Sequence, residues 1–257
     1  MARWIDFDND YKTMDLTFME SVWWVFDQLW KKGLIYEGVK VMPYSWRVST
    51  PLSNFEANLN YKDTQDPSVT VKFALTSEPK TFILAWTTTP WTIPANLAIA
   101  LNPKIEYAFI DTGKRVLIVA KELAETFAED CGIENWTILK TTLGSTLEGA
   151  ETRHPFVDRA SPIVLADYVT TESGTGCVHT APGHGLDDYL TGQKYGMEIY
   201  CPVNDDGVYD DDGQIPDYLV NASVLETNGW TPANGKVMKA LTDHGALLGK
   251  KLSLIHI

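Results

Sequence analysis

The stretch Ala85-Trp86-Thr87-Thr88-Thr89-Pro90-Trp91-Thr92-Ile93-Pro94-Ala95-Asn96 carries five hydroxyl or amide side chains, two prolines and two tryptophans. Residues 81–86 are β-branched, aromatic or aliphatic, which predicts a buried strand that delivers the threonines to its end. Pro90 and Pro94 fix φ and remove two amide donors, so we expect a stiff, irregular loop after Thr89. The pattern indicates a site for a polar ligand; the other interpretation is a threonine-rich strand end with turn prolines.

A second unusual segment is Gly174-Thr175-Gly176-Cys177-Val178-His179-Thr180-Ala181-Pro182-Gly183-His184-Gly185-Leu186-Asp187-Asp188. Its glycines, histidines and carboxylates are too polar and too flexible for a protein core. Glycines let a backbone approach a ligand closely, and loops on a rigid scaffold often carry function. We therefore expect a functional loop here, followed by a helix from about Tyr189.

Composition and charge limit the classes of protein that fit. The 257 residues are 44% hydrophobic, enough for one large domain with or without a flanking subdomain. The absence of an 18-residue apolar run and of a signal sequence predicts a cytoplasmic protein with no membrane partner. A net charge of −13 argues against a broad phosphate-binding surface. The acidic runs at 205–206 and 210–212 are interpreted as solvated turns, with a Ca²⁺ loop as the alternative that lacks a closing Glu.

Periodicity predicts a mixed fold. Apolar residues at helical spacing predict a helix from Leu16 to about Gly33, whose tryptophans are expected in a core. From Val69 onward short strands dominate, with a hairpin formed by residues 105–110 and 115–120 and with helices at 121–130, 188–195 and 235–244. This order predicts an α+β fold with a β-barrel-like domain and peripheral helices.

Together the two quoted segments resemble the editing domain, or connective peptide 1, of isoleucyl-tRNA synthetases in the class I aminoacyl-tRNA synthetase family. Thr89-Pro90-Trp91-Thr92 matches the isoleucine form, whereas the valine and leucine enzymes carry Arg-Pro-Glu/Asp-Thr. Residues 3–7 and 51–56 also resemble the flank of this insertion. The resemblance implies that residues 1–50 are a helical flank from the parent class I catalytic domain. Residues 51–257 would be the editing domain with its return segment.

Some signatures of the parent enzymes are missing. Neither His-Ile-Gly-His, Lys-Met-Ser-Lys-Ser nor Gly-x-x-x-x-Gly-Lys occurs, so we expect no ATP site in this chain and no cofactor for editing. The segment 45–49 lacks the cysteine of some relatives, and no metal is expected. Both chain ends look like cuts through a larger protein, which predicts a monomeric fragment whose partners include the rest of the parent synthetase.

The resemblance implies an aminoacyl-tRNA deacylase that removes valine from tRNA(Ile) and binds the 3′-terminal aminoacyl-adenosine. Asp188 would bind the α-ammonium, and its place at a helix start favours a carboxylate; the alternative is an N-cap role, for which Asp187 could also serve. The implied residues fall into two groups: Thr88, Thr89 and Asp188 as catalytic, and Thr87, Thr92, Asn96, His179, His184 and Asp187 as substrate-binding.

The two histidines leave further alternatives. A zinc site with Cys177 would need both imidazoles on one helix face, which Pro182 and the glycines prevent. A Ser-His-Asp triad lacks its Gly-x-Ser-x-Gly turn. By resemblance His179 limits the size of the side-chain pocket, and His184 orders the loop. The competing function is a non-catalytic module that binds the tRNA acceptor end without hydrolysis.

Overall fold

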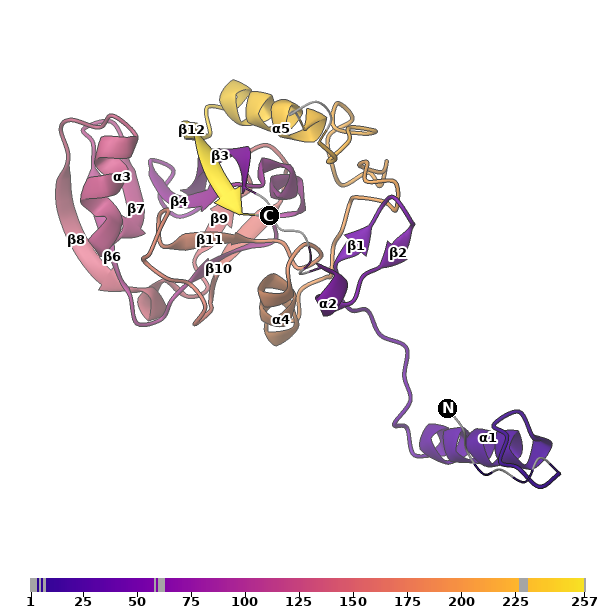
Figure 1. Cartoon of the computed structure of the whole chain (residues 1–257). Coiled ribbons are helices and arrows are strands. Elements are labelled where there is room, and N and C mark those ends of the chain that lie inside the picture. Colours follow the sequence, from indigo (N-terminus) through magenta and orange to yellow (C-terminus); the bar gives the residue numbers. More distant parts are fainter. Residues whose placement is uncertain are drawn as a thin grey trace. The chain divides into compact units, whose positions relative to one another are not determined.

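The computed structural model describes residues 4, 6, 8–57, 59, 63–226 and 231–256 (Figure 1). Arg3, Ile5 and Phe7 of the flanking motif and Ile257 of the C-terminal run lie outside these residues. The chain divides into two units, residues 1–40 and residues 41–257. The flank predicted for residues 1–50 therefore contributes to both units, and its origin in a catalytic domain stays a prediction.

The first unit contains the helix α1 (Leu16–Lys31), as the periodicity predicts. The expectation that its tryptophans lie in a core is wrong, because no residue of α1 is buried. Trp23 and Trp24 are 68% and 64% exposed. A single helix cannot bury its own apolar stripe, since burial requires a second layer of secondary structure.

The second unit is built on a ten-stranded sheet. Its strands are β3 (Asp63–Leu75), β4 (Thr81–Thr87), β5 (Ala98–Leu101), β6 (Glu106–Asp111), β7 (Val116–Ala120), β8 (Thr137–Leu143), β9 (Glu151–Arg153), β10 (Ala160–Leu165), β11 (Cys177–Thr180) and β12 (Leu247–His256). Helical segments are α2 (Asn54–Ala57), η1 (Pro90–Ala95), η2 (Lys121–Leu123), α3 (Ala124–Asp130), η3 (Gly144–Leu147), α4 (Leu186–Lys194) and α5 (Pro232–Asp243). A separate two-stranded sheet joins β1 (Tyr44–Ser45) and β2 (Thr50–Pro51).

The large sheet is open. Among the described strands the order runs β11-β5-β10-β9-β3-β4-β7-β6-β8, with β12 paired to β3. The long strand β3 pairs with β4, β9 and β12, so the sheet branches there. The fold is mixed α/β with a large sheet, and the predicted barrel-like closure is not confirmed.

Alternating side chains give the sheet two apolar faces. Val71, Phe73 and Ile83 belong to the main core, and all three are fully buried. Leu84 points to the opposite face, where it packs in a second cluster with Phe127 of α3. Figure 1 shows α3 beside β6 and β7. The predicted hairpin is confirmed, because β6 and β7 pair antiparallel.

Strand pairing brings the two quoted segments together. The threonine run ends β4 and enters η1, and η1 leads directly into β5. Strand β11, in the glycine-rich segment, pairs antiparallel with β5 and sets His179 opposite Ile99. Two expectations need correction. Residues 177–180, which were expected to belong to a loop, form strand β11. The segment after Thr89, expected to be an irregular loop, is a 3₁₀ helix with Pro90 in its first turn, where a missing amide hydrogen costs nothing.

Candidate functional site

Six of the nine site residues predicted from the sequence line one cavity of about 190 Å³. These six come from the end of β4, from η1, from β11 and from the start of α4, together with the loops between them. The cavity is lined by Trp86, Thr87, Thr89, Thr92, Val178, His179, Ala181, His184 and Asp188.

The threonine hydroxyls form a connected chain. The Oγ1 atom of Thr89 lies 3.2 Å from Oγ1 of Thr87 and 3.4 Å from Oγ1 of Thr92. The backbone N–H of Thr89 donates to Thr87 Oγ1 at 3.0 Å. Thr92 donates its hydroxyl to the Thr89 carbonyl at 2.8 Å. The turn from strand to 3₁₀ helix therefore fixes three hydroxyls along one wall of the cavity.

His179 joins this chain from the neighbouring strand. Its Nε2 lies 2.8 Å from Thr92 Oγ1. The side chain is buried, and its Nδ1 has no hydrogen-bond partner among the described residues. Burial lowers the pKa of His179 to about 4, with a smaller contribution from His184, so the ring is neutral near pH 7.

His184 lines the same cavity as His179. Its ring packs edge-on against Trp91, with 5.2 Å between the ring centroids. Burial lowers the pKa of His184 to about 4. Two neutral imidazoles therefore line the cavity, and neither adds positive charge near pH 7.

Asp188 ties the end of β11 to the start of α4. Its Oδ2 accepts the backbone N–H of Ala181 at 2.9 Å, and its Oδ1 accepts the hydroxyl of Tyr168 at 3.1 Å. Gly185 is the N-cap of α4, so the carboxylate does not cap its own helix. Burial raises the pKa of Asp188 above its ordinary value of 3.8, although both hydrogen bonds oppose this. A carboxylate has about four lone pairs, and acceptor capacity therefore remains for a cationic ligand.

Three predicted residues do not line the cavity. Thr88 is partly exposed beside it, and Asp187 is exposed on the first turn of α4. Asn96 is fully buried, where it donates to the Ala98 carbonyl at 2.8 Å and accepts from Ser161 at 2.7 Å. These contacts hold the chain between η1 and β5, and Asn96 is not among the residues that line the cavity.

Side chains from distant segments hold η1 in place. Asn234 accepts the backbone N–H of Trp91 at 2.9 Å, and Tyr209 donates to the Trp91 carbonyl. His154 donates to the Ile93 carbonyl at 2.8 Å, and Arg159 donates to the Pro94 carbonyl at 3.1 Å. These contacts satisfy backbone groups that a proline-containing turn cannot pair internally.

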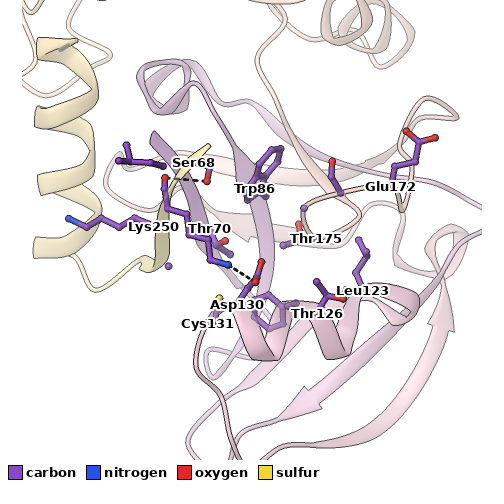
Figure 2. Close-up of a pocket in the computed structure, with 16 residues that line it drawn as sticks. Ser68, Thr70, Trp86, Leu123, Thr126, Asp130, Cys131, Glu172, Thr175 and Lys250 are labelled. Atoms are coloured by element: carbon purple, nitrogen blue, oxygen red, sulfur yellow. Dashed lines mark hydrogen bonds and ion pairs between the residues drawn. The ribbon is translucent and has the colours of Figure 1, made fainter. Parts of the chain in front are cut away.

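A second cavity, of about 440 Å³, opens on the opposite face of β4 (Figure 2). Trp86 lines this second cavity, because its side chain projects to the face opposite Thr87, and it also lines the edge of the 190 Å³ cavity. Gly174 makes room for this ring: a Cβ atom there would lie 3.1 Å from the indole. An ion pair between Lys251 and Asp130 crosses the cavity.

Several residues that support the 190 Å³ cavity belong to no sequence pattern that predicts a functional site. His154, Tyr209 and Asn234 lie far from both quoted segments along the chain, and Tyr168 lies shortly before the second segment. Only the tertiary fold brings their side chains into contact with these segments. Trp86 stands in the first quoted segment, but strand alternation predicts that it faces away from Thr87, and so the pattern does not mark it as part of the same cavity.

A model of the tRNA synthetases of class I (I, L, M and V) matches residues 1–224. The chain belongs to this family. One similar protein is the isoleucine–tRNA ligase of Bdellovibrio bacteriovorus. It is 48% identical in sequence over a region that covers 85% of this chain and 21% of the length of that ligase. The ligase of Mycobacterium leprae is 42% identical over 92% of this chain and 24% of the relative. This chain thus spans about a fifth of the length of the curated relatives it matches.

The fold of this chain is also similar to that of a solved structure. The crystal structure of GlLeuRS-CP1 matches with a TM-score of 0.50 and 14% identity, over 72% of this chain and 99% of that one. At this identity the match supports the fold alone.

Two features are absent from the residues that the structure describes. None of the helices there has the length and apolar character needed to cross a bilayer. In the same part of the chain, no three His, Cys, Asp or Glu side chains are grouped as ligands for a metal ion.

Proposed function

We propose that this chain is the editing module of an isoleucine–tRNA ligase and hydrolyses the ester of valyl-tRNA(Ile). The observation that carries the proposal is the convergence of Thr89, Thr92, His179 and Asp188 on one small cavity. The curated relatives support the choice of ligase. The 3′-terminal aminoacyl-adenosine of tRNA(Ile) is the proposed substrate, and the rest of a parent synthetase is the proposed partner of a monomeric chain.

The cavity suits the aminoacyl part of this substrate. Pockets for drug-sized ligands usually have volumes of about 300 to 1,000 Å³, so about 190 Å³ admits an amino acid and leaves the nucleoside outside. A methylene group contributes about 1 to 3 kcal/mol of discrimination, for which isoleucine and valine are the standard example. A pocket that excludes the larger amino acid provides the second selection step.

The chemistry follows from the groups in the cavity. An aminoacyl ester is already activated, so a positioned water and donors for the tetrahedral oxyanion are sufficient for hydrolysis. The threonine hydroxyls are the proposed donors, with Thr88 and Thr89 nearest the ester, while the Asp188 carboxylate pairs with the α-ammonium. Thr87, Thr92, His179, His184 and Asp187 are proposed to position substrate, and no cofactor or metal takes part.

The test is release of valine from valyl-tRNA(Ile) by this chain at micromolar concentration. We expect deacylation above the spontaneous rate, slower release of isoleucine, and no loss of activity in excess EDTA. Pyrophosphate exchange with ATP should be absent. Failure to accelerate valine release would reject hydrolysis, and restoration of EDTA-inhibited activity by zinc would reject the metal-free site.

Asp188 provides the sharpest single-residue prediction. Replacing it with Asn keeps an oxygen that can accept the Ala181 N–H but removes the negative charge. Charge-assisted contacts contribute about 1.5 to 3 kcal/mol, so we expect Asp188→Asn to lower kcat/KM for valyl-tRNA(Ile) by about 10- to 100-fold. The melting temperature should change little. Full activity in Asp188→Asn would show that the carboxylate only orders the loop.

A further inference from the structure

The Asp188 carboxylate is held by one donor on each oxygen. Its Oδ2 accepts the backbone N–H of Ala181 at 2.9 Å, and its Oδ1 accepts the hydroxyl of Tyr168 at 3.1 Å. These donors come from different segments, since Ala181 follows β11 and Tyr168 follows β10. A rotation of the carboxylate about its Cβ–Cγ bond breaks these hydrogen bonds. The carboxyl plane is therefore fixed at the place where Asp188 lines the 190 Å³ cavity.

Only one of the two donors depends on a side chain. The Ala181 N–H belongs to the backbone, whereas the second donor is the tyrosine hydroxyl. The Tyr168 ring also packs against a small apolar cluster that contains Ala98, Ala100 and Val164. This packing requires the aromatic ring alone, and a phenylalanine provides the same ring. The hydroxyl is thus the part of Tyr168 that packing does not explain.

The hydroxyl also acts on the charge of Asp188. Burial raises the pKa of this carboxyl above 3.8, Asp187 adds a smaller increase, and the two hydrogen bonds oppose both effects. Burial raises the pKa of Tyr168 above its ordinary value of 10, so the hydroxyl keeps its proton and donates at neutral pH. The other titratable groups that line the cavity are His179 and His184, which are neutral near pH 7.

We propose that Tyr168 is a positioning residue for deacylation, whose hydroxyl keeps the Asp188 carboxylate ionised and oriented for the α-ammonium group of the substrate. This inference rests on the proposed editing function, in which the charge of Asp188 binds that group. Protonation removes the charge, so binding through Asp188 is lost at low pH. Without the Tyr168 hydroxyl the charged form loses one of its two donors, and the pH at which binding is lost rises.

The first measurement is the pH dependence of kcat/KM for valyl-tRNA(Ile), which reports ionisations of the free enzyme. Tyr168→Phe keeps the ring and removes the hydroxyl. We expect the acid limb of its profile to lie about one pH unit higher than in the wild type, the shift that corresponds to losing one hydrogen bond to a charged group. An acid limb at the wild-type position would overturn the inference.

Tyr195→Phe is the matched control. The Tyr195 ring packs against the same apolar cluster, but its hydroxyl donates to Glu148 at 2.6 Å, and neither residue lines the 190 Å³ cavity. Its acid limb should coincide with that of the wild type. An equal upward shift in both variants would show that loss of any hydroxyl from this cluster disturbs the site, and would reject a specific role for Tyr168.

A titration without substrate separates this inference from the proposed hydrolysis. The isotopically labelled Asp188 carboxyl carbon, assigned by its absence in Asp188→Asn, is followed by NMR through the acid range. We expect a higher pKa of Asp188 in Tyr168→Phe than in the wild type. Equal pKa values with hydrolysis by both proteins overturn the inference and leave the editing function in place. A raised pKa in a chain that hydrolyses no ester supports the action of Tyr168 on Asp188 and rejects the deacylase.

Discussion

Acidification from about pH 6.5 to pH 4 should lower the free energy of unfolding of residues 41–257 by several kcal/mol. Three histidines are held there in the neutral form. Burial lowers the pKa of His154 to about 3 and that of His179 and of His184 to about 4, from an ordinary value of 6.5. The unfolded chain exposes all three rings to water, where they take up protons near pH 6.5.

The contacts of His154 explain why it resists protonation. Its Nδ1 accepts the backbone N–H groups of Val157 and Phe156 at 3.0 and 3.3 Å. Its Nε2 donates to the Ile93 carbonyl. A second ring proton on Nδ1 would face two donors and break both bonds. The neutral ring is therefore part of the framework that holds η1 behind the threonines.

The direction of the pH effect follows from the order of the pKa values. Because the folded pKa lies below the unfolded one, the unfolded chain binds more protons between about pH 6.5 and the folded pKa, and stability falls as the pH falls through this window. Each histidine contributes about 1.4 kcal/mol per pH unit. Asp188 has a raised folded pKa, so its protonation stabilises the fold at low pH and opposes the histidines weakly.

Urea unfolding followed by circular dichroism at constant ionic strength measures this dependence. His154→Gln, which retains a donor and an acceptor but does not titrate, should flatten the slope between pH 6.5 and 4 relative to the wild type. The matched variant His244→Gln replaces an exposed histidine. NMR titration of the His154 and His179 ring protons gives an independent readout. Ring titration near pH 6.5 in the folded state would contradict the prediction.

The sequence predicts those features of the fold that depend on local patterns. A run of β-branched, aromatic and aliphatic residues identifies β4, and the hairpin of β6 and β7 follows from two apolar runs around a short turn. Strand β11 escapes this reasoning because its pairing with β5 is a long-range interaction that overrides the glycines and histidines around it. The open sheet likewise depends on the three partners of β3, which no local pattern specifies.

The candidate site divides in the same way. Two short segments of sequence are sufficient to predict four of the site residues, and the structure brings these four to one cavity: Thr89, Thr92, His179 and Asp188. The residues that fix these segments cannot be read from either segment. Asn234 contacts Trp91 from a helix far along the chain, and Tyr168 contacts Asp188 across 20 residues. Such supporting contacts are set by packing, for which a single sequence carries no periodic signal.

The size of the amino-acid pocket gives the second large expected effect. His179→Ala should allow this chain to hydrolyse correctly charged isoleucyl-tRNA(Ile), because removing the imidazole opens space for about one further methylene group. The threonine turn keeps its own hydrogen bond, since Thr92 still donates to the Thr89 carbonyl. The ratio of isoleucine to valine release should rise by about 10- to 200-fold, the range that corresponds to about 1 to 3 kcal/mol for a methylene.

Measuring both esters on the same preparation makes the ratio independent of the fraction of folded protein. Thr92→Val is the matched control: it removes the oxygen that contacts His179 Nε2 but leaves the imidazole in the pocket wall. We expect this variant to lower both rates without changing their ratio. If His179 only orders the glycine-rich segment, both variants will slow the two esters alike. If the ratio of isoleucine to valine release rises in His179→Ala alone, the imidazole of His179 is the group that sterically excludes the isoleucine side chain from the pocket.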